Sequence, residues 1–577
     1  MSSADKCRPQ LVVPMPSTAT IPKAVFWIFL VIGQVLTAQV PLPPTSASGD
    51  RCDLSGQWNL DEQPATNATG NLVFETANSL LQHWANTRYR NGHTIVPGTV
   101  PVGTILYHGA IMGPHVPTAL DWVATEPDHS MLFCMGEVKS GCLHVTFVVT
   151  RPMKVLYFDG SSAALFSEGS MDTQDLMAWS EMKPEWALNE YQRIEDLCKW
   201  GQKYGLNGFV RMQMNFEMMI CNFTSHMEVV SSLNLETLHL KLKNGQPTED
   251  LNTMHSTFEL MHSASWREAY PGETQVILDY SGLVSFYDTA LVPSLVPRRV
   301  GLERWDHRVA GISSEDMERV KDRLIQVLEQ PPVTASGIDW KTVLRLVVDR
   351  YASRLDVMQY LLNTTLDDTH ILLDHAEKVQ RQLRTVLTPY TVLAAVPSYT
   401  SVTSDTQNSW AVPVFRECVT SHMSSISISA RGTTLTPSER LLLQALQETT
   451  REICRVATRM WASGLTAGVD PFYPANKRPD ADHIRTLMDE WKKDLRGLMS
   501  WLDWSVWVKC RPACNVEEIC YLPTWPIGFF PPPYDFPESQ NSARSQTMEN
   551  TSLPDPNKGE WKRPQPKCIR RLGPYGF

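Results

Sequence analysis

An α+β fold is predicted for this chain of 577 residues by two changes of pattern along its length. Residues 51–300 combine short β-branched and aromatic runs with helical periodicity, which predicts a mixed α/β domain. In residues 301–503 apolar side chains recur every three to four positions, which predicts an all-α domain. Residues 504–577 are rich in cysteine and proline, which predicts a C-terminal segment held by disulfides and partly disordered.

Strands of the first domain are predicted where Val, Phe and Tyr cluster, at 143–149, 153–158, 209–223 and 274–280. A helix is predicted at 184–205, where apolar side chains fall on one face and glycine closes the run.

The helices of the second domain have recognisable starts and stops. Ser313 precedes a periodic run at 313–330, and Thr436, Pro437 and Glu439 form the best helix start in the chain, a capping box with proline in the first turn. Further helices are predicted at 339–363, 372–387 and 480–502.

The composition excludes two classes of protein. Apolar residues make up 42% of the chain and charged residues 20%, which is typical of a folded protein and not of a disordered one. The net charge of −10 is spread thinly and no long basic run occurs, so a nucleic-acid-binding surface is not expected.

The N-terminus predicts entry into the secretory pathway. Residues 24–38 are apolar, follow Lys23 and precede a polar, proline-rich linker at 39–50, so residues 1–38 are predicted to be a signal peptide cut after Ala38. The alternative is an uncleaved signal anchor, in which residues 24–38 hold a single-pass protein in the membrane.

Cysteines and sequons agree with a secreted glycoprotein. Cys510, Cys514, Cys520 and Cys568 lie among prolines, where disulfides are the natural constraint, and their spacing is not that of a zinc site. Glycosylation is permitted at four Asn-X-Ser/Thr sequons, which begin at Asn67, Asn222, Asn363 and Asn550.

The stretches "GTILYHGA" and "DWVATEPDHSMLFC" suggest a nucleotide site. With the strands after them, residues 95–160 resemble the start of the ADP-ribosyltransferase-like fold. The resemblance implies that His108 bonds the nicotinamide ribose of NAD, that the backbone of Gly109 holds the carboxamide, and that Trp122 or Phe133 walls the ring. The alternative is that His108 caps a turn and bonds to backbone.

Cleavage of the glycosidic bond of NAD builds positive charge on the ribose, so such an enzyme needs a carboxylate beside it. No glutamate occupies the final-strand position that the resemblance requires. Asp159, Glu168 and Glu217 are the candidate catalytic residues because each lies near the end of a predicted strand.

A second resemblance concerns "KYGLNGFVRMQMNFE", which is similar to the helix–glycine–strand run that carries the acid catalysts of chitinase-like barrels. It implies a glutamate that protonates the leaving oxygen, whereas Glu217 of this stretch lies too far along the sequence for that position. The sequence departs from that pattern at Asn207, Arg211 and Gln213, where the barrels carry acidic or inward-facing catalytic positions.

Across residues 154–530 the chain resembles a fungal family of conserved proteins that have a secretory leader and no assigned activity. The stretches that carry this likeness are "KVLYFDGSSAALFSEGSMDTQD", "LCKWGQKYGLNGFVRMQMNFE", "SFYDTALVPSLVPRRVGLERWDHRVAGI" and "CRPACNVEEICYLPTWPIGFF". The sequence therefore predicts a secreted or secretory-pathway fungal protein with a binding or structural role. An NAD-dependent ADP-ribosyltransferase-like enzyme and a chitinase-like glycoside hydrolase are the alternatives, and NAD is the one cofactor implied.

Overall fold

The computed structural model describes most of the chain in two compact units. The residues that it describes are 58–111, 116–136, 141–212, 214–236, 238–239, 242–243, 246–247, 262–330, 335–364, 369–396, 408–424, 426, 435–473, 480–524 and 559–572. What we call the sheet unit takes its described residues from Pro64–Asp356, Ser425–Thr449 and Met499–Phe577, and the helical unit takes its own from Met1–Gln63, Val357–Ser424 and Thr450–Leu498. The predicted all-α segment 301–503 therefore contributes to both units.

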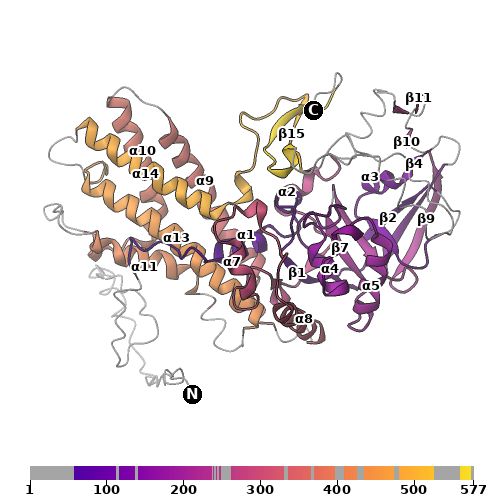
Figure 1. The fold of residues 1–577 in the computed structure, drawn as a ribbon. Coiled ribbons are helices and arrows are strands. Elements are labelled where there is room, and N and C mark those ends of the chain that lie inside the picture. Colours follow the sequence, from indigo (N-terminus) through magenta and orange to yellow (C-terminus); the bar gives the residue numbers. More distant parts are fainter. Residues whose placement is uncertain are drawn as a thin grey trace, which may run out of the picture. The chain divides into compact units, whose positions relative to one another are not determined.

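A ten-stranded sheet forms the centre of the sheet unit (Figure 1). Its order is β13-β1-β6-β7-β8-β3-β2-β5-β9, and β14 also pairs with β1. The strands are β1 (Thr94–Val100), β2 (Ile105–Ala110), β3 (Asp121–Ala124), β5 (Cys142–Val149), β6 (Met153–Phe158), β7 (Gly208–Met212), β8 (Phe216–Ile220), β9 (Met227–Leu235), β13 (Ile277–Leu278) and β14 (Val284–Ser285).

The direction of the strands decides where side chains can meet. β6 and β7 are parallel, with Val155 opposite Gly208, whereas the other strand pairs of this sheet are antiparallel. The residues after β6 and after β7 therefore lie at the same edge of the sheet. The prediction of one strand over 209–223 was wrong, because the chain reverses near Asn215, whose side chain accepts the N–H of Phe216, and β8 returns antiparallel to β7.

Three helices cover one face of the sheet. They are α4 (Asp172–Trp179), α5 (Glu190–Gln202) and α8 (Ser314–Glu329). Their apolar faces bury Leu176, Ile194 and Val320 in one core with Leu156 and Phe209 of the parallel strands. The predicted mixed α/β domain, followed by helices and a cysteine-rich C-terminus, is confirmed as the fold class.

Shorter elements complete the sheet unit. The helices are α1 (Gly70–Ser79), α2 (His83–Arg88), α3 (Pro127–Ser130) and α7 (Val296–Arg299). Two-stranded pairs join β4 (Met135–Gly136) to β10 (Leu238–His239), and β11 (Leu242–Lys243) to β12 (Gln246–Pro247). Across the described chain, turns of 3₁₀ helix occur at Met131–Cys134, Pro184–Trp186, Ser265–Arg267, Tyr280–Gly282, Pro293–Leu295, Arg304–Asp306, Thr388–Tyr390, Leu393–Ala395, Ser409–Ala411, Ser505–Trp507 and Glu560–Lys562.

Helix starts follow the capping chemistry of the sequence. The hydroxyl of Ser313 accepts the N–H of Asp316 at the start of α8. At the start of α13 (Pro437–Thr466) the Thr436 hydroxyl accepts the N–H of Glu439, whose carboxylate accepts the N–H of Thr436 at 2.8 Å. Both predicted caps are therefore confirmed.

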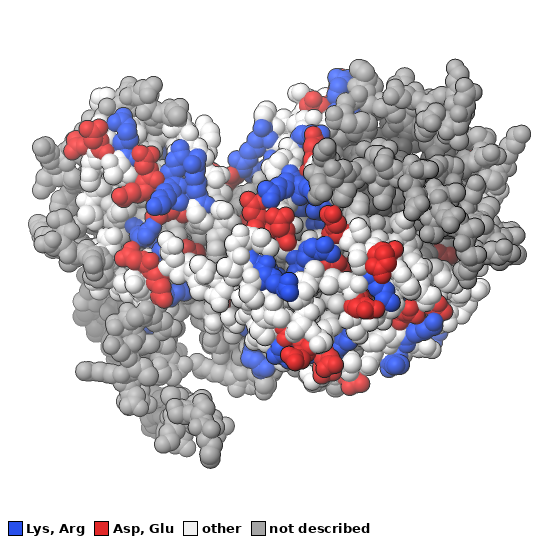
Figure 2. All heavy atoms as spheres, viewed as in Figure 1, with Lys and Arg blue, Asp and Glu red and all other residues white. Residues whose placement is uncertain are grey.

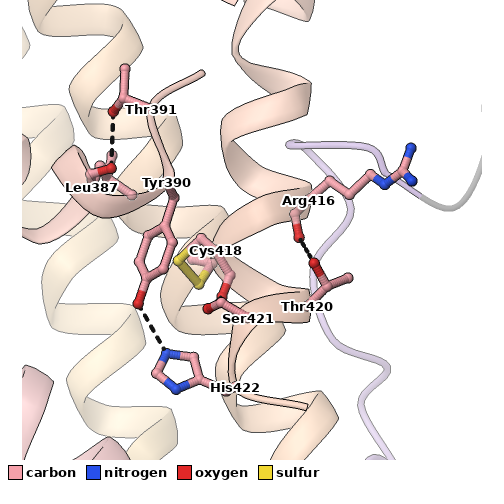
Figure 3. The surroundings of a disulfide bond; sticks show 9 residues. Leu387, Tyr390, Thr391, Arg416, Cys418, Thr420, Ser421 and His422 are labelled. Carbon is pink, nitrogen blue, oxygen red and sulfur yellow. Dashed lines mark hydrogen bonds between the residues drawn. A yellow bond between two sulfur atoms is a disulfide. The ribbon is translucent and has the colours of Figure 1, made fainter. Parts of the chain in front are cut away.

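The helical unit contains α10 (Thr369–Leu387), α11 (Val412–Ser421) and parts of α9 (Trp340–Asn363), α13 and α14 (Ala481–Leu502). The disulfide Cys418–Cys454 joins α11 to α13, and Figure 3 shows its surroundings, with the Tyr390 hydroxyl directed at the His422 ring. Asp470 is fully buried and accepts hydrogen bonds from Gln380 and Arg384. These contacts tie α10 to the segment that follows α13.

The cysteine-rich C-terminus forms a small cross-linked ribbon. β15 (Glu518–Tyr521) pairs antiparallel with β16 (Lys567–Arg570). The four C-terminal cysteines form the disulfides Cys510–Cys520 and Cys514–Cys568. The predicted disulfides are thus present, and three more join Cys134 to Cys142, Cys198 to Cys221 and Cys418 to Cys454.

Several predictions concern residues outside the described ranges. They are the signal peptide or anchor with its apolar run 24–38, the linker 39–50 and the sequon at Asn550. Of the helices that the structure describes, none has the length and apolar character that a membrane span requires. On the face seen in Figure 2, basic and acidic side chains are interspersed over the described surface.

Candidate functional site

A small polar cavity lies in the sheet unit where β6 ends and β1 begins. Its volume of about 20 Å³ has room for about one water molecule, and it lies in a partly open depression. Side chains of α1 and α2, Tyr287 and three loops line it. We call the loops 89–93, 159–170 and 301–308 the rim loops, because each contributes at least one lining residue.

Asp159 comes directly after β6 and joins that strand to β1. Its Oδ1 accepts the backbone N–H groups of His93 and Thr94, both at 2.7 Å, and its own N–H donates to the carbonyl of Thr94. Burial raises the pKa of Asp159 to about 7, although the two N–H donors oppose that shift. The carboxyl group therefore changes charge near neutral pH while it lines the cavity.

Two glycines allow the first two rim loops to approach each other. A Cβ on Gly92 would lie 2.2 Å from the carbonyl oxygen of Asp159, and one on Gly160 would lie 2.5 Å from the backbone nitrogen of Gly92. Gly160 also has φ of +77°, which favours glycine. The "NGH" and "DG" sequences are therefore required for the backbone contact beside the cavity.

His93 presents an unpartnered ring nitrogen. Its Nδ1–H donates to the carbonyl of Asn91 at 2.9 Å, because a carbonyl can only accept, so Nε2 carries the lone pair. Nε2 is buried and has no hydrogen-bond partner among the described residues. Burial, with the nearby Arg299, holds the pKa of His93 well below its usual value, and the ring stays neutral. It stacks on Tyr287 with 4.5 Å between ring centroids.

Arg304 supplies hydrogen-bond donors from the third rim loop. Its Nη2 donates to the hydroxyl of Thr76 on α1, and its guanidinium lies 4.2 Å from the ring centroid of Tyr89. Nη1 is 3.6 Å from Oδ2 of Asp503. Within the described part of the chain, Nε and Nη1 have no hydrogen-bond acceptor. Arg304 is thus positioned by one carboxylate and still has unused donors.

Glu75 on α1 is a second buried carboxyl group next to Thr76. Its Oε1 accepts the N–H of Ser505, whereas Oε2 is buried without a hydrogen-bond partner in the described residues. Burial raises the pKa of Glu75 to about 7. Two carboxyl groups that titrate near neutrality therefore occur around Arg304.

These groups can bind a small polar molecule. Arg304 and His93 both line a space that holds one oxygen atom, and each has a buried polar atom without a hydrogen-bond partner among the described residues. Such atoms are costly unless a ligand or water completes them. A cation site is not indicated among the residues the structure describes. There, the one group at metal-ligand separation is Cys510, Cys514 and Cys520, whose sulfurs form disulfides.

The predicted nucleotide residues lie elsewhere, on β2 and β3. His108 is almost buried, and its Nδ1–H donates to the carbonyl of Trp122 at 2.7 Å, which is the backbone bond of the alternative interpretation. Its Nε2 is 4.0 Å from Oδ2 of Asp121. A Cβ on Gly109 would lie 2.3 Å from the carbonyl oxygen of Ser130, so this glycine is required for packing against α3.

Trp122 and Phe133, the two side chains predicted to line the nicotinamide ring, differ in burial. Trp122 packs against the core beneath α4, α5 and α8, whereas Phe133 is 44% exposed. Neither of them lines the cavity beside Asp159.

Of the three candidate carboxylates, Asp159 lines the cavity. Glu217 on β8 is buried beneath Arg211, which donates to it at 2.5 and 3.1 Å. Glu168 is 40% exposed and lies 3.9 Å from Nζ of Lys562. The three carboxylates that were predicted from their positions near strand ends therefore lie at three different places in the structure.

His93, Tyr287 and Arg304 were not predicted as site residues from the sequence. Two of these lie in "SFYDTALVPSLVPRRVGLERWDHRVAGI", which carried the fungal resemblance without a role. The available signal was the glycine of "NGH" just before β1, because glycine permits close approach of two backbone segments. It could have indicated His93 and not the other two residues.

The fold and site define a disulfide-linked α+β protein with a polar cavity at a sheet edge. Residues 137–251 match the family model described as the YPL277C N-terminal domain. The chain is 22% identical over 551 residues to uncharacterized protein YOR389W of Saccharomyces cerevisiae, covering 80% of this chain and 82% of that protein. It is 24% identical over 380 residues to uncharacterized protein YPL277C of the same yeast, and the match covers 51% of this chain and 76% of that protein.

These similarities support the resemblance to an uncharacterised fungal family, and they indicate no reaction. The resemblance of residues 95–160 to the ADP-ribosyltransferase-like fold is not shown by them and stays a prediction.

Proposed function

We propose that this chain is a secretory-pathway binding protein, and that its cavity beside Asp159 takes one hydroxyl group of a small sugar or polyol. The observation that supports this proposal is the set of buried, unpartnered polar atoms around a space the size of one water molecule. Small-molecule sites are concave and carry a few convergent polar groups of this kind.

A hydroxyl group fits the unused atoms best. It can donate to Nε2 of His93 and accept from Arg304 at the same time, which neither a carboxylate nor an ammonium group can do. A carboxylate or phosphate would meet the carboxyl group of Asp159, which is partly ionised at neutral pH. An ammonium group would meet the guanidinium of Arg304.

The size of the cavity limits the rest of the ligand. With room for about one water molecule, it accepts a single hydroxyl oxygen, and the remaining atoms of the ligand lie in the partly open depression. The ring of Tyr287 already stacks on His93, and the ring of Tyr89 already lies against the guanidinium of Arg304, so these ring faces are not free to contact the ligand. We therefore expect weak binding, with Kd on the order of 1 mM.

The secretory location is supported by the disulfides. The ten cysteines of the described residues form five disulfides, and disulfides persist in oxidising compartments. The side chains of Asn67, Asn222 and Asn363 are exposed and accessible for glycosylation. Peptide mapping of protein purified from culture medium, before and after enzymatic deglycosylation, tests this location. Intact free thiols and unmodified sequons in a cell-retained protein would contradict it.

The binding proposal is tested by saturation-transfer NMR on the full chain with D-glucose, D-mannose, N-acetylglucosamine and glycerol as probes. His93→Phe keeps a ring against Tyr287 but removes the acceptor, and Arg304→Gln removes the charged donors. Arg381→Gln on α10 is the matched control, because that side chain is 55% exposed and pairs with Glu377. Signal lost in the two cavity variants alone supports the proposal. Equal signal in all variants, or none in the wild type, overturns it.

A further inference from the structure

A short C-terminal segment contacts all three rim loops. We call residues 559–572 the strap, and its consecutive residues Trp561, Lys562 and Arg563 make these contacts. The rim-loop residues that they touch lie within eight positions of a residue that lines the cavity. The strap is far from these loops in the sequence, so only the folding of the chain brings them into contact.

Trp561 makes the most buried of these contacts. It is 5% exposed, and its ring stacks on Phe166 with centroids 4.8 Å apart and planes inclined by 19°. The guanidinium of Arg90 lies 4.4 Å from the same ring. Aromatic stacking and a cation over an indole are both attractive interactions. One indole thus joins the first rim loop to the second.

The next two strap residues add ion pairs. Lys562 lies 3.9 Å from Glu168 of the second rim loop, and Arg563 pairs with Glu303 at 2.9 Å and Asp306 at 3.2 Å in the third. These side chains are partly exposed, so each pair contributes little alone. These ion pairs matter for the position of the third rim loop, because they hold it against the same segment that contacts the first two rim loops.

A disulfide tethers the strap. Cys568 of β16 is bonded to Cys514, and β16 pairs with β15 along four residues. The other disulfide of the ribbon, Cys510–Cys520, does not include a strap residue. Both disulfides therefore belong to the same C-terminal ribbon, but only Cys514–Cys568 holds a strap residue.

We propose that the strap is a clamp that fixes the three rim loops, and that Trp561 is a positioning residue for the cavity. This inference rests on the proposed function for its ligand. The clamp holds His93, Asp159 and Arg304 at fixed separations, so a bound hydroxyl group meets preorganised partners without a further ordering cost. Without the clamp the three loops open locally while the sheet stays folded.

Hydrogen–deuterium exchange of the full chain tests the clamp without any ligand. The variants are Trp561→Ala and the pair Cys514→Ala/Cys568→Ala. Their controls are Trp186→Ala, whose ring contacts Trp179 instead of a rim loop, and Cys510→Ala/Cys520→Ala. We expect amides of the rim loops to exchange about tenfold faster in both clamp variants, with unchanged exchange in β5 and in both controls. Trp561→Phe should restore slow exchange, since it keeps a ring on Phe166.

Titration with D-mannose on the same proteins separates the two proposals. Faster rim-loop exchange with weaker mannose binding supports both. Faster exchange in a protein whose wild type binds none of the probes supports the clamp and overturns the proposed ligand. Unchanged rim-loop exchange in Trp561→Ala overturns the clamp, whether or not mannose binds. Faster exchange throughout the sheet would also overturn it, because the role would then be general stability.

Discussion

The carboxylate of Asp159 accepts the backbone N–H of His93 across 2.7 Å, although the two residues are 66 positions apart in the sequence. This bond joins the residue that follows β6 to the residue that precedes β1, so a titratable carboxyl group and a neutral ring occur at the same junction. The cavity, the two close glycines and the rim loops all depend on that junction.

The ionisation of Asp159 and Glu75 should lower the stability of the folded chain as the pH rises from about 4 to about 7. Burial raises the pKa values of both groups to about 7 in the folded chain. In the unfolded chain both groups release their protons near pH 4. Over this interval these two groups bind more protons in the folded state, so their contribution to the free energy of unfolding falls with pH and levels off above about pH 7. The buried side chains of His93, His129 and His307 have lowered pKa values and contribute with the opposite sign, so thermal unfolding between pH 4 and 8 is compared between the wild type and variants of the two carboxyl groups.

Asp159→Asn and Glu75→Gln should each remove one of these contributions, so the free energy of unfolding falls less with pH, or rises more, than in the wild type. In the first variant the amide oxygen that replaces Oδ1 can still accept the two backbone N–H groups, so the junction is kept while the ionisation is lost. Each pKa unit is equivalent to about 1.4 kcal/mol. If the wild type and both variants show the same slope, these carboxyl groups do not titrate in this interval, and this part of the account is wrong.

Substitution of Arg211 should destabilise the sheet unit strongly. Arg211 is 2% exposed and pairs with Glu217 at 2.5 Å and Glu190 at 2.6 Å. Arg211→Met leaves the buried carboxylate of Glu217 without its partner, whereas Glu190 keeps Arg193, and the loss costs about 3–5 kcal/mol. The double variant Arg211→Met/Glu217→Met should be less damaging than the single one, because it removes one buried charge as well. Denaturant unfolding compares them, and a harmless Arg211→Met would refute the argument.

His108 should behave as a structural residue. Its Nδ1–H donates to the carbonyl of Trp122, so His108→Ala should lower the free energy of unfolding by about 0.5–1.5 kcal/mol. Calorimetry with NAD should give a flat titration for wild type and variant alike. Saturable NAD binding that the substitution weakens would instead support the ADP-ribosyltransferase-like interpretation.

The disulfides should be recovered as pairs by mass spectrometry under non-reducing conditions. We expect peptides that link Cys510 to Cys520 and Cys514 to Cys568. A loop closed by one such bond contributes about 2–4 kcal/mol, so reduction should lower the melting temperature. Recovery of all four as free thiols would contradict the cross-linked ribbon.

Local chemistry made much of the fold predictable. Ser313 and the Thr436–Glu439 pair mark helix starts because their side chains accept N–H groups of the first turn, which have no partner within the helix. The strand at 209–223 was not divided correctly, because its apolar run is continuous while the reversal depends on Asn215, one polar residue among many. Periodicity detects burial and does not detect a tight turn between two buried strands.

The candidate site was predictable only in part. Asp159 stood out because it follows a clear strand, and it does line the cavity. Arg304 and Tyr287 come from loops about 130 to 145 positions later, and the Trp561 contact comes from the opposite end of the chain. No local pattern in one sequence reports that such segments meet, since their contacts are long-range and their residue types are common on surfaces.

A crystal structure of the full chain soaked with D-mannose tests the central claim most directly. The account predicts one sugar hydroxyl oxygen in the cavity, about 3 Å from Nε2 of His93 and from a guanidinium nitrogen of Arg304. A cavity that holds only a water molecule, with mannose absent or bound elsewhere, would contradict it.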